Sequence, residues 1–141
     1  YHRLGLVGAT LPFEIELDRL AALQKPFDCG LLVYGYLPLM TYRACPVRLS
    51  KGCGACREQG AWLSDRLGNR FRVSCRLGGP QLYNSLPLYA GDLRRALPFA
   101  VPELLFTFEE PAQCDQVLRL FLAGEKFPGK RTHSMYLRRL L

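Results

Sequence analysis

Four cysteines lie close together in this chain, and thiols are the side chains here best suited to chemistry. Cys45, Cys53, Cys56 and Cys75 follow the pattern C-x7-C-x2-C-x18-C, a spacing typical of a metal or iron–sulfur site. Two cysteines separated by two residues can present both sulfurs to one metal from a single tight turn, and Gly54 allows the backbone to curl there. Spacing alone leaves zinc, an iron–sulfur cluster and unlinked buried thiols as alternatives.

The segment around these cysteines is strongly basic. Residues 43–76 hold eight basic side chains and two acidic ones, so they carry +6 of the chain's formal net charge of +7. Nearby arginines lower the pKa of a thiol and offset the negative charge of a four-thiolate site. A basic surface also suits a polyanion such as RNA, with a merely solvated surface as the alternative. The candidate contacts to a substrate or polyanion are Arg43, Arg48, Lys51, Arg57 and Asn84.

The remaining chemistry-bearing residues are less informative. Cys29 and Cys114 are interpreted as core thiols, since Cys114 falls on the apolar stripe of a predicted helix. Neither H-E-x-x-H nor G-x-S-x-G occurs in the sequence, so no self-contained hydrolytic site is visible. The catalytic residues are therefore unknown from sequence.

Composition places the chain among ordinary globular domains. It has 141 residues, of which 49% are hydrophobic and 22% charged, as expected for one packed domain. No secretory signal and no apolar run of about 20 residues occurs, so we expect a cytoplasmic protein without a membrane span. The sequence opens on Tyr1 within a sheet-like pattern, which favours a fragment of a longer polypeptide.

The elements that must position the cysteines begin with a strand–helix–strand pattern. Residues 4–11 predict a strand buried on both faces, residues 14–23 an amphipathic helix, and residues 30–34 a second strand. Such a βα repeat builds a parallel sheet or barrel. The cysteine segment starts just after the second strand, at the end of the sheet where α/β folds bind ligands.

A hairpin and a helix are expected farther along. AWLSD and RFRVSCR flank a turn at residues 66–69, with Phe71, Val73 and Cys75 on one face of the second strand and arginines on the other. Residues 82–88 predict a short strand or extended loop, and residues 103–108 a further strand. A helix then starts at Pro111 and ends at Gly124, and residues 128–133 are expected to form a loop or a loosely held basic tail.

Three motifs resemble one known family. The stretches VYGYLPLMTYRACPVRLSKGCGAC, LSDRLGNRFRV and LYNSLPLYAGDL resemble peptidase family U thirty-two, the collagenase-like proteins. The resemblance covers about residues 4–107, with the motifs in family order. It implies an α/β fold in which residues 1–42 are the final βα units of a TIM-like barrel. Residues 43–97 would form a cysteine-rich, cluster-binding segment with a β-hairpin, and residues 98–141 a small C-terminal strand–helix part with a basic tail.

The resemblance also implies a function. Family members are similar to iron–sulfur hydroxylases that act without molecular oxygen on a tRNA or rRNA base or on ubiquinone, with prephenate as the implied hydroxyl donor. By motif position, Cys45, Cys53, Cys56 and Cys75 would hold a 4Fe-4S cluster, with RNA as the expected partner. The alternatives are the peptidase of the family name and a non-catalytic module that binds zinc or RNA.

The family's architecture further implies a missing partner segment. A TIM-like barrel needs about 250 residues, more than this chain holds. The N-terminal barrel portion of the same protein would therefore pair with this piece, and we expect the piece alone to be inactive.

Overall fold

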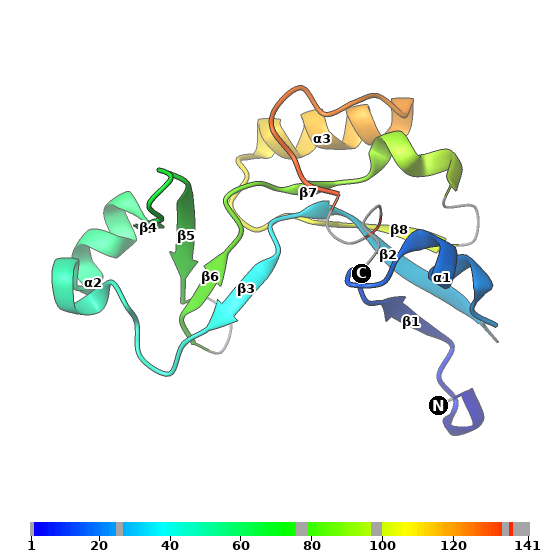
Figure 1. Ribbon diagram of the computed structural model, residues 1–141, viewed down its shortest axis with the longest axis horizontal. Coiled ribbons are helices and arrows are strands. Elements are labelled where there is room, and N and C mark those ends of the chain that lie inside the picture. The colour runs from blue at the N-terminus through cyan, green and yellow to red at the C-terminus, as the bar shows by residue number, and fades with distance from the viewer. Residues whose placement is uncertain (1, 25–26, 76–78, 97–99, 134–135, 137–141) are drawn as a thin grey trace. The chain divides into compact units, whose positions relative to one another are not determined.

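The computed structural model describes residues 2–24, 27–75, 79–96, 100–133 and 136 of this mixed α/β chain (Figure 1). The chain forms two compact units, Tyr1–Gly35 with Pro87–Leu141, and Tyr36–Leu86. The second unit is thus a continuous insertion in the first, and all four clustered cysteines lie within it. The boundaries of these two units differ from the boundaries of the three segments expected from the sequence.

The first unit is built on the strand β2 (Asp28–Gly35). It pairs in parallel with β1 (Gly8–Leu11) and with β8 (Ala100–Leu105), and antiparallel with the short β7 (Leu88–Tyr89). The helix α1 (Leu17–Ala22) connects β1 to β2 and buries Leu20 completely. The predicted strand–helix–strand opening is confirmed, and β8 adds a third parallel strand beside β2.

The first strand is shorter and more exposed than predicted. A 3-10 helix, η1 (His2–Leu4), occupies the start of the predicted strand, and Leu4 and Val7 are 84% and 87% exposed. Within the described residues β1 pairs only with β2. The prediction of burial on both faces is therefore wrong, because burial depends on neighbours that an apolar run does not specify.

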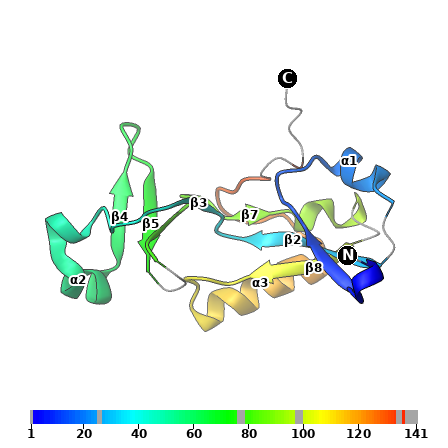
Figure 2. The same ribbon diagram turned by 90° about the horizontal axis from the view of Figure 1, so that it is seen from below.

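The helix α3 (Pro111–Ala123) confirms the strongest local prediction. Glu110 and Gln113 form a reciprocal capping box at its start, and Gly124 adopts a left-handed conformation at its end, which satisfies backbone groups at both termini. The helix lies alongside the first sheet in both views (Figures 1 and 2), and its Val117 packs with Tyr34 and Tyr89 in one core cluster. The 3-10 helix η2 (Gly91–Ala96) contacts α3.

The C-terminal segment is held more firmly than a loose tail would be. Arg131 Nη2 donates to Asp92 Oδ2 at 2.5 Å, and His133 Nε2 lies 3.4 Å from Asp92 Oδ1. The hydroxyl of Tyr136, which is 2% exposed, donates to the carbonyl of Leu32 at 2.7 Å. Residues 128–133 form a loop, as one of the two alternatives predicted, but Arg131 and His133 are not loosely held, because each finds a partner more than thirty positions away in sequence.

Tyr136 should make stability fall at alkaline pH. Burial, with a smaller effect of Glu103, raises the pKa of Tyr136 above its usual value near 10. The folded state then keeps a proton that the unfolded state loses, so the stabilisation is complete below pH 10 and is lost as the pH rises above it, by about 1.4 kcal/mol per pH unit. Urea unfolding between pH 8 and pH 11 should show a shallower decline for Tyr136→Phe than for the wild type. Parallel declines would contradict this origin of the pH dependence.

The second unit carries an antiparallel sheet and one helix. The strands β3 (Pro38–Thr41), β6 (Gln81–Tyr83), β5 (Arg70–Ser74) and β4 (Ala61–Ser64) lie in that order. The helix α2 (Arg48–Gln59) connects β3 to β4. The predicted hairpin is confirmed as β4 and β5, while the region 82–88 divides between β6 and β7. Among the helices that the structure describes, none has the length and apolar character needed to cross a bilayer.

Candidate metal centre

The four clustered cysteines are distributed over one helix and the chain on either side of it. Cys45 lies just before α2, Cys53 and Cys56 lie on α2, and Cys75 directly follows β5. Side chains three positions apart in a helix lie on the same side. The helix therefore presents Cys53 and Cys56 together, as the C-x2-C spacing requires.

The backbone turns at Gly52 rather than at Gly54. Gly52 interrupts the helical conformation of α2 with φ 71° and ψ 168°, a region essentially restricted to glycine. Gly54 lies within the helical part that follows. The tight turn predicted between Cys53 and Cys56 is therefore wrong, because the pair is presented by a helical turn that starts just after a glycine break.

An apolar cluster supports part of the cysteine site. Val47, Ala61 and Val73 are 3%, 1% and 3% exposed, and the side chains of Cys45 and Cys56 pack against them. Ala61 and Val73 are paired across β4 and β5, so they share one face of the hairpin. Cys45 and Cys56 consequently lie on the apolar face of the hairpin, held by packing from three elements.

The other three clustered cysteines act electrostatically on Cys75. The pKa of Cys75 is raised above its usual value, first by partial desolvation and then by the charge of Cys45 and a hydrogen bond with it. The charges of Cys56 and Cys53 raise it further. Cys75 is nevertheless exposed, as is Cys53, so solvent screens these effects. Residues separated by up to 30 positions in sequence are thus brought within electrostatic range of one another.

The four clustered cysteines are suitable ligands for a metal that prefers sulfur, but their side chains are not arranged as a metal site in this structure. Among the described residues, no three Cys, His, Asp or Glu side chains converge as a group that could hold one metal ion. Desolvation first, and then the charges of the other clustered cysteines, raise the pKa of Cys75, and a bound cation would favour the deprotonated thiols. Soft sulfur ligands in this number match zinc or an iron–sulfur cluster.

The predicted polyanion contacts are only partly described. The side chains of Arg43 and Arg48 are exposed, while those of Lys51 and Arg57 lie outside the described part of the structure. Asn84 is half-buried, and its backbone N–H donates to the carbonyl of Leu37 at 2.9 Å. The role of these residues stays a prediction.

Two clusters in the structure are absent from the sequence-based list of sites. The first joins Asp92 to Arg131 and His133, which no local motif signals. The second places Arg70 and Arg72 over the ring of Trp62. The alternation of the predicted hairpin contained the signal for this second cluster, since it puts the arginines on the face opposite Cys75.

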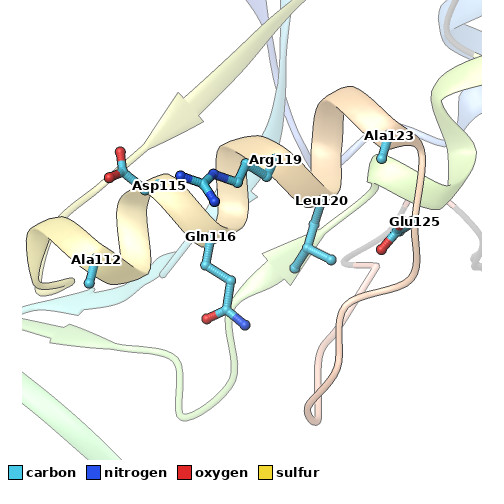
Figure 3. A pocket seen from close by; sticks show the side chains of 7 residues that line it. All are labelled: Ala112, Asp115, Gln116, Arg119, Leu120, Ala123 and Glu125. Atoms are coloured by element: carbon cyan, nitrogen blue, oxygen red, sulfur yellow. The ribbon is translucent and has the colours of Figure 1, made fainter.

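A shallow hollow runs along α3 in the first unit. Its lining residues on α3 are spaced as one stripe of the helix, and Glu125 follows the helix end (Figure 3): Ala112, Asp115, Gln116, Arg119, Leu120, Ala123 and Glu125. Residues three and four apart form such a stripe on any exposed helix. The hollow contains no cysteine, and we assign it no role.

Gly52 and Gly54 provide a matched test of the helix break. Gly52→Ala should destabilise the second unit by about 1–3 kcal/mol, because alanine does not tolerate this conformation, and it should weaken metal binding by displacing Cys45 from Cys53. Gly54→Ala should be neutral or stabilising by up to about 1 kcal/mol, since it replaces glycine within a helix and no atom lies within 4 Å of the added carbon. Denaturant unfolding with metal analysis compares the two variants. Equal effects would contradict the assignment of the break to Gly52.

A comparison with protein-family models found no match for this chain, and neither curated proteins nor solved structures matched it significantly.

Proposed function

We propose that this chain is the C-terminal portion of a TIM-like barrel protein of peptidase family U thirty-two. Its inserted unit would hold a 4Fe-4S cluster on Cys45, Cys53, Cys56 and Cys75 and would support oxygen-independent hydroxylation of a tRNA or rRNA base in the cytoplasm. Prephenate is the proposed hydroxyl donor, and the N-terminal barrel portion is the proposed partner segment.

The observation that carries this proposal is the position of Cys45 between two other clustered cysteines. Cys45 packs on the same apolar cluster as Cys56 and is hydrogen-bonded with Cys75. Two of the four clustered cysteines remain exposed, unlike the ordinary core thiol Cys29, which is 3% exposed. Gathered, partly exposed thiols in a basic segment favour a ligand set over core packing.

The architecture of the first unit supports the barrel part of the proposal. Three parallel strands, β1, β2 and β8, lie side by side, with α1 after β1 and α3 after β8. Alternation of parallel strands and helices is the repeat from which TIM-like barrels are built. The cysteine unit follows the C-terminal end of β2, where barrel enzymes hold their active sites.

The cluster, when bound, would supply electron transfer, and the residues of the chain have separate tasks. The cysteines would hold it, and the apolar cluster of Val47, Ala61 and Val73 keeps water from one side of Cys45 and Cys56. The basic side chains of this segment would offset the negative charge of the thiolates and attract RNA.

RNA mass analysis tests the proposed activity in the native protein. The codon for Cys56 is changed to serine in the organism that encodes the chain, with Cys114→Ser as the matched control. We expect tRNA or rRNA from the Cys56 variant to lack one oxygen atom at one nucleoside, while the control retains it. Identical nucleoside masses in both strains would contradict RNA hydroxylation.

Zinc binding is the second candidate, and the same four-thiolate chemistry supports it. A zinc module would contain one zinc ion per chain without sulfide and would bind RNA without modifying it. The peptidase alternative makes a different prediction, since proteolysis would persist after all four clustered cysteines are replaced. Metal analysis and a protease assay on the same preparation distinguish the three functions.

A further inference from the structure

The face of the β4–β5 hairpin opposite the cysteines carries an aromatic ring covered by arginines. The guanidinium carbon of Arg70 lies 4.8 Å from the centroid of the Trp62 ring, and that of Arg72 lies 5.4 Å from it. Trp62 and Arg72 are paired directly across the two strands. We call Trp62, Arg70 and Arg72 the Trp–Arg face.

The Trp–Arg face is separate from the apolar face of the same hairpin. Ala61 and Val73 point into the core cluster with Cys45 and Cys56, and successive strand residues point to opposite sides. Trp62 and Arg72, the next residues in register, therefore point away from the cysteines. Trp62 is half-buried and Arg70 is exposed, so the stack can be reached from solvent.

The hairpin's only carboxylate, Asp65, is held within the turn. Asp65 accepts hydrogen bonds from the backbone N–H groups of Leu67 and Asn69 at 2.8 and 2.9 Å, and from Asn69 Nδ2 at 2.7 Å. These bonds within the turn lower the pKa of Asp65, the side chain of Asn69 most. In the described part of the chain, Arg70 forms no ion pair with a carboxylate.

We propose that the Trp–Arg face binds a single-stranded nucleic acid. An indole ring stacked with guanidinium groups offers flat surfaces for bases and cationic donors for the phosphates between them, the combination by which proteins bind single strands without reading sequence. The net charge of +6 over residues 43–76 adds long-range attraction. The inference deepens the proposed function by naming where its RNA docks, but binding at this face needs no metal.

Trp62 is the only tryptophan of the chain, so its fluorescence reports on this face alone. The chain is titrated with a ten-nucleotide oligouridylate, with oligothymidylate of the same length, and with heparin as a polyanion that has no bases. We expect saturable quenching by either oligonucleotide, because bases stack on the ring, and little quenching by heparin. Equal quenching by RNA and DNA means recognition of the shared single-strand chemistry, and stronger quenching by RNA adds contacts to its 2′-hydroxyl groups.

Matched variants then test which residues bind. By fluorescence anisotropy of a labelled oligouridylate, Arg70→Gln with Arg72→Gln should weaken binding about tenfold to a hundredfold and make its salt dependence shallower. Trp62→Leu should weaken binding about tenfold with an unchanged salt dependence. The control is Lys126→Gln with Lys130→Gln, which removes the same charge from exposed positions in the other unit and should change affinity less than threefold.

Three results would overturn the proposal: no quenching by either oligonucleotide, equal quenching by heparin, or equal losses of affinity in the arginine variant and the lysine control. Equal quenching by heparin would favour an acidic protein partner instead. Iron and sulfide content is measured in each variant and should not change. Failure of nucleic-acid binding with intact metal content would refute this inference alone, whereas retained binding without metal would refute the proposed function alone.

Discussion

Gly91→Ala is expected to lower the free energy of unfolding by about 3 kcal/mol. A methyl group at position 91 would overlap the phenol oxygen and ring of Tyr89. Tyr89 has no room to move, since it is fully buried, its hydroxyl donates to the carbonyl of Glu125 at 2.7 Å, and its ring lies 5.3 Å from that of Phe127. The variant must either shift the backbone or expel the ring, and such overpacking costs 1–3 kcal/mol or more. Equilibrium denaturation in urea measures the loss.

Two further variants separate this clash from a general effect of replacing glycine. Gly8→Ala should cost less than about 1 kcal/mol, because the added carbon makes only an ordinary contact at 3.4 Å with the carbonyl of Asp28. Tyr89→Leu should be destabilising alone, but Gly91→Ala should add little to it once the ring is gone. Full additivity of the two substitutions would contradict a clash between Gly91 and Tyr89.

Replacement of Cys56 by serine is expected to abolish metal binding. Cys56 is one of the two thiols that pack on the apolar cluster of the hairpin, so its sulfur is restricted in position, and serine is a poor ligand for iron or zinc. Stability supplied by the bound metal should disappear with it, since a ligand that binds only the folded state stabilises that state by an amount that rises with the logarithm of its concentration relative to Kd. Metal content and thermal unfolding before and after treatment with a chelator measure both effects.

Cys114→Ser is the matched control for this substitution. Cys114 is also half-buried, but it lies on α3 in the other unit. Cys114→Ser should leave the metal content unchanged and keep the stability that the bound metal supplies. Loss of metal from the Cys114 variant, or full metal content in the Cys56 variant, would contradict the assignment of the ligands.

Local patterns in the sequence predicted the local structure well. The helix from Pro111 to Gly124 was predictable because its start, apolar stripe and stop are all encoded within fourteen residues. The hairpin was predictable for the same reason, since alternation and turn residues lie next to each other. The helix α2 and its break at Gly52 were not predicted, because Gly52 and Gly54 look alike in sequence and differ only in backbone conformation.

These local patterns did not predict which distant segments of the chain pair with one another. The predicted strand at residues 103–108 begins earlier, at Ala100, and lies in parallel beside β2, although about seventy residues separate the two strands. The contact of Asp92 with Arg131 and His133 likewise joins distant segments. In the cysteine site, spacing identified the four thiols. Only the fold shows that Cys45 and Cys56 pack on the same apolar cluster, and that the other three cysteines contribute to the raised pKa of Cys75.

Iron and acid-labile sulfide per chain, measured on protein purified without oxygen, test whether the four cysteines hold a 4Fe-4S cluster. We expect about four of each per chain, and background levels when Cys45, Cys53, Cys56 and Cys75 are all replaced by serine. One tightly bound zinc without sulfide, or iron and sulfide that survive replacement of all four cysteines, would refute the cluster.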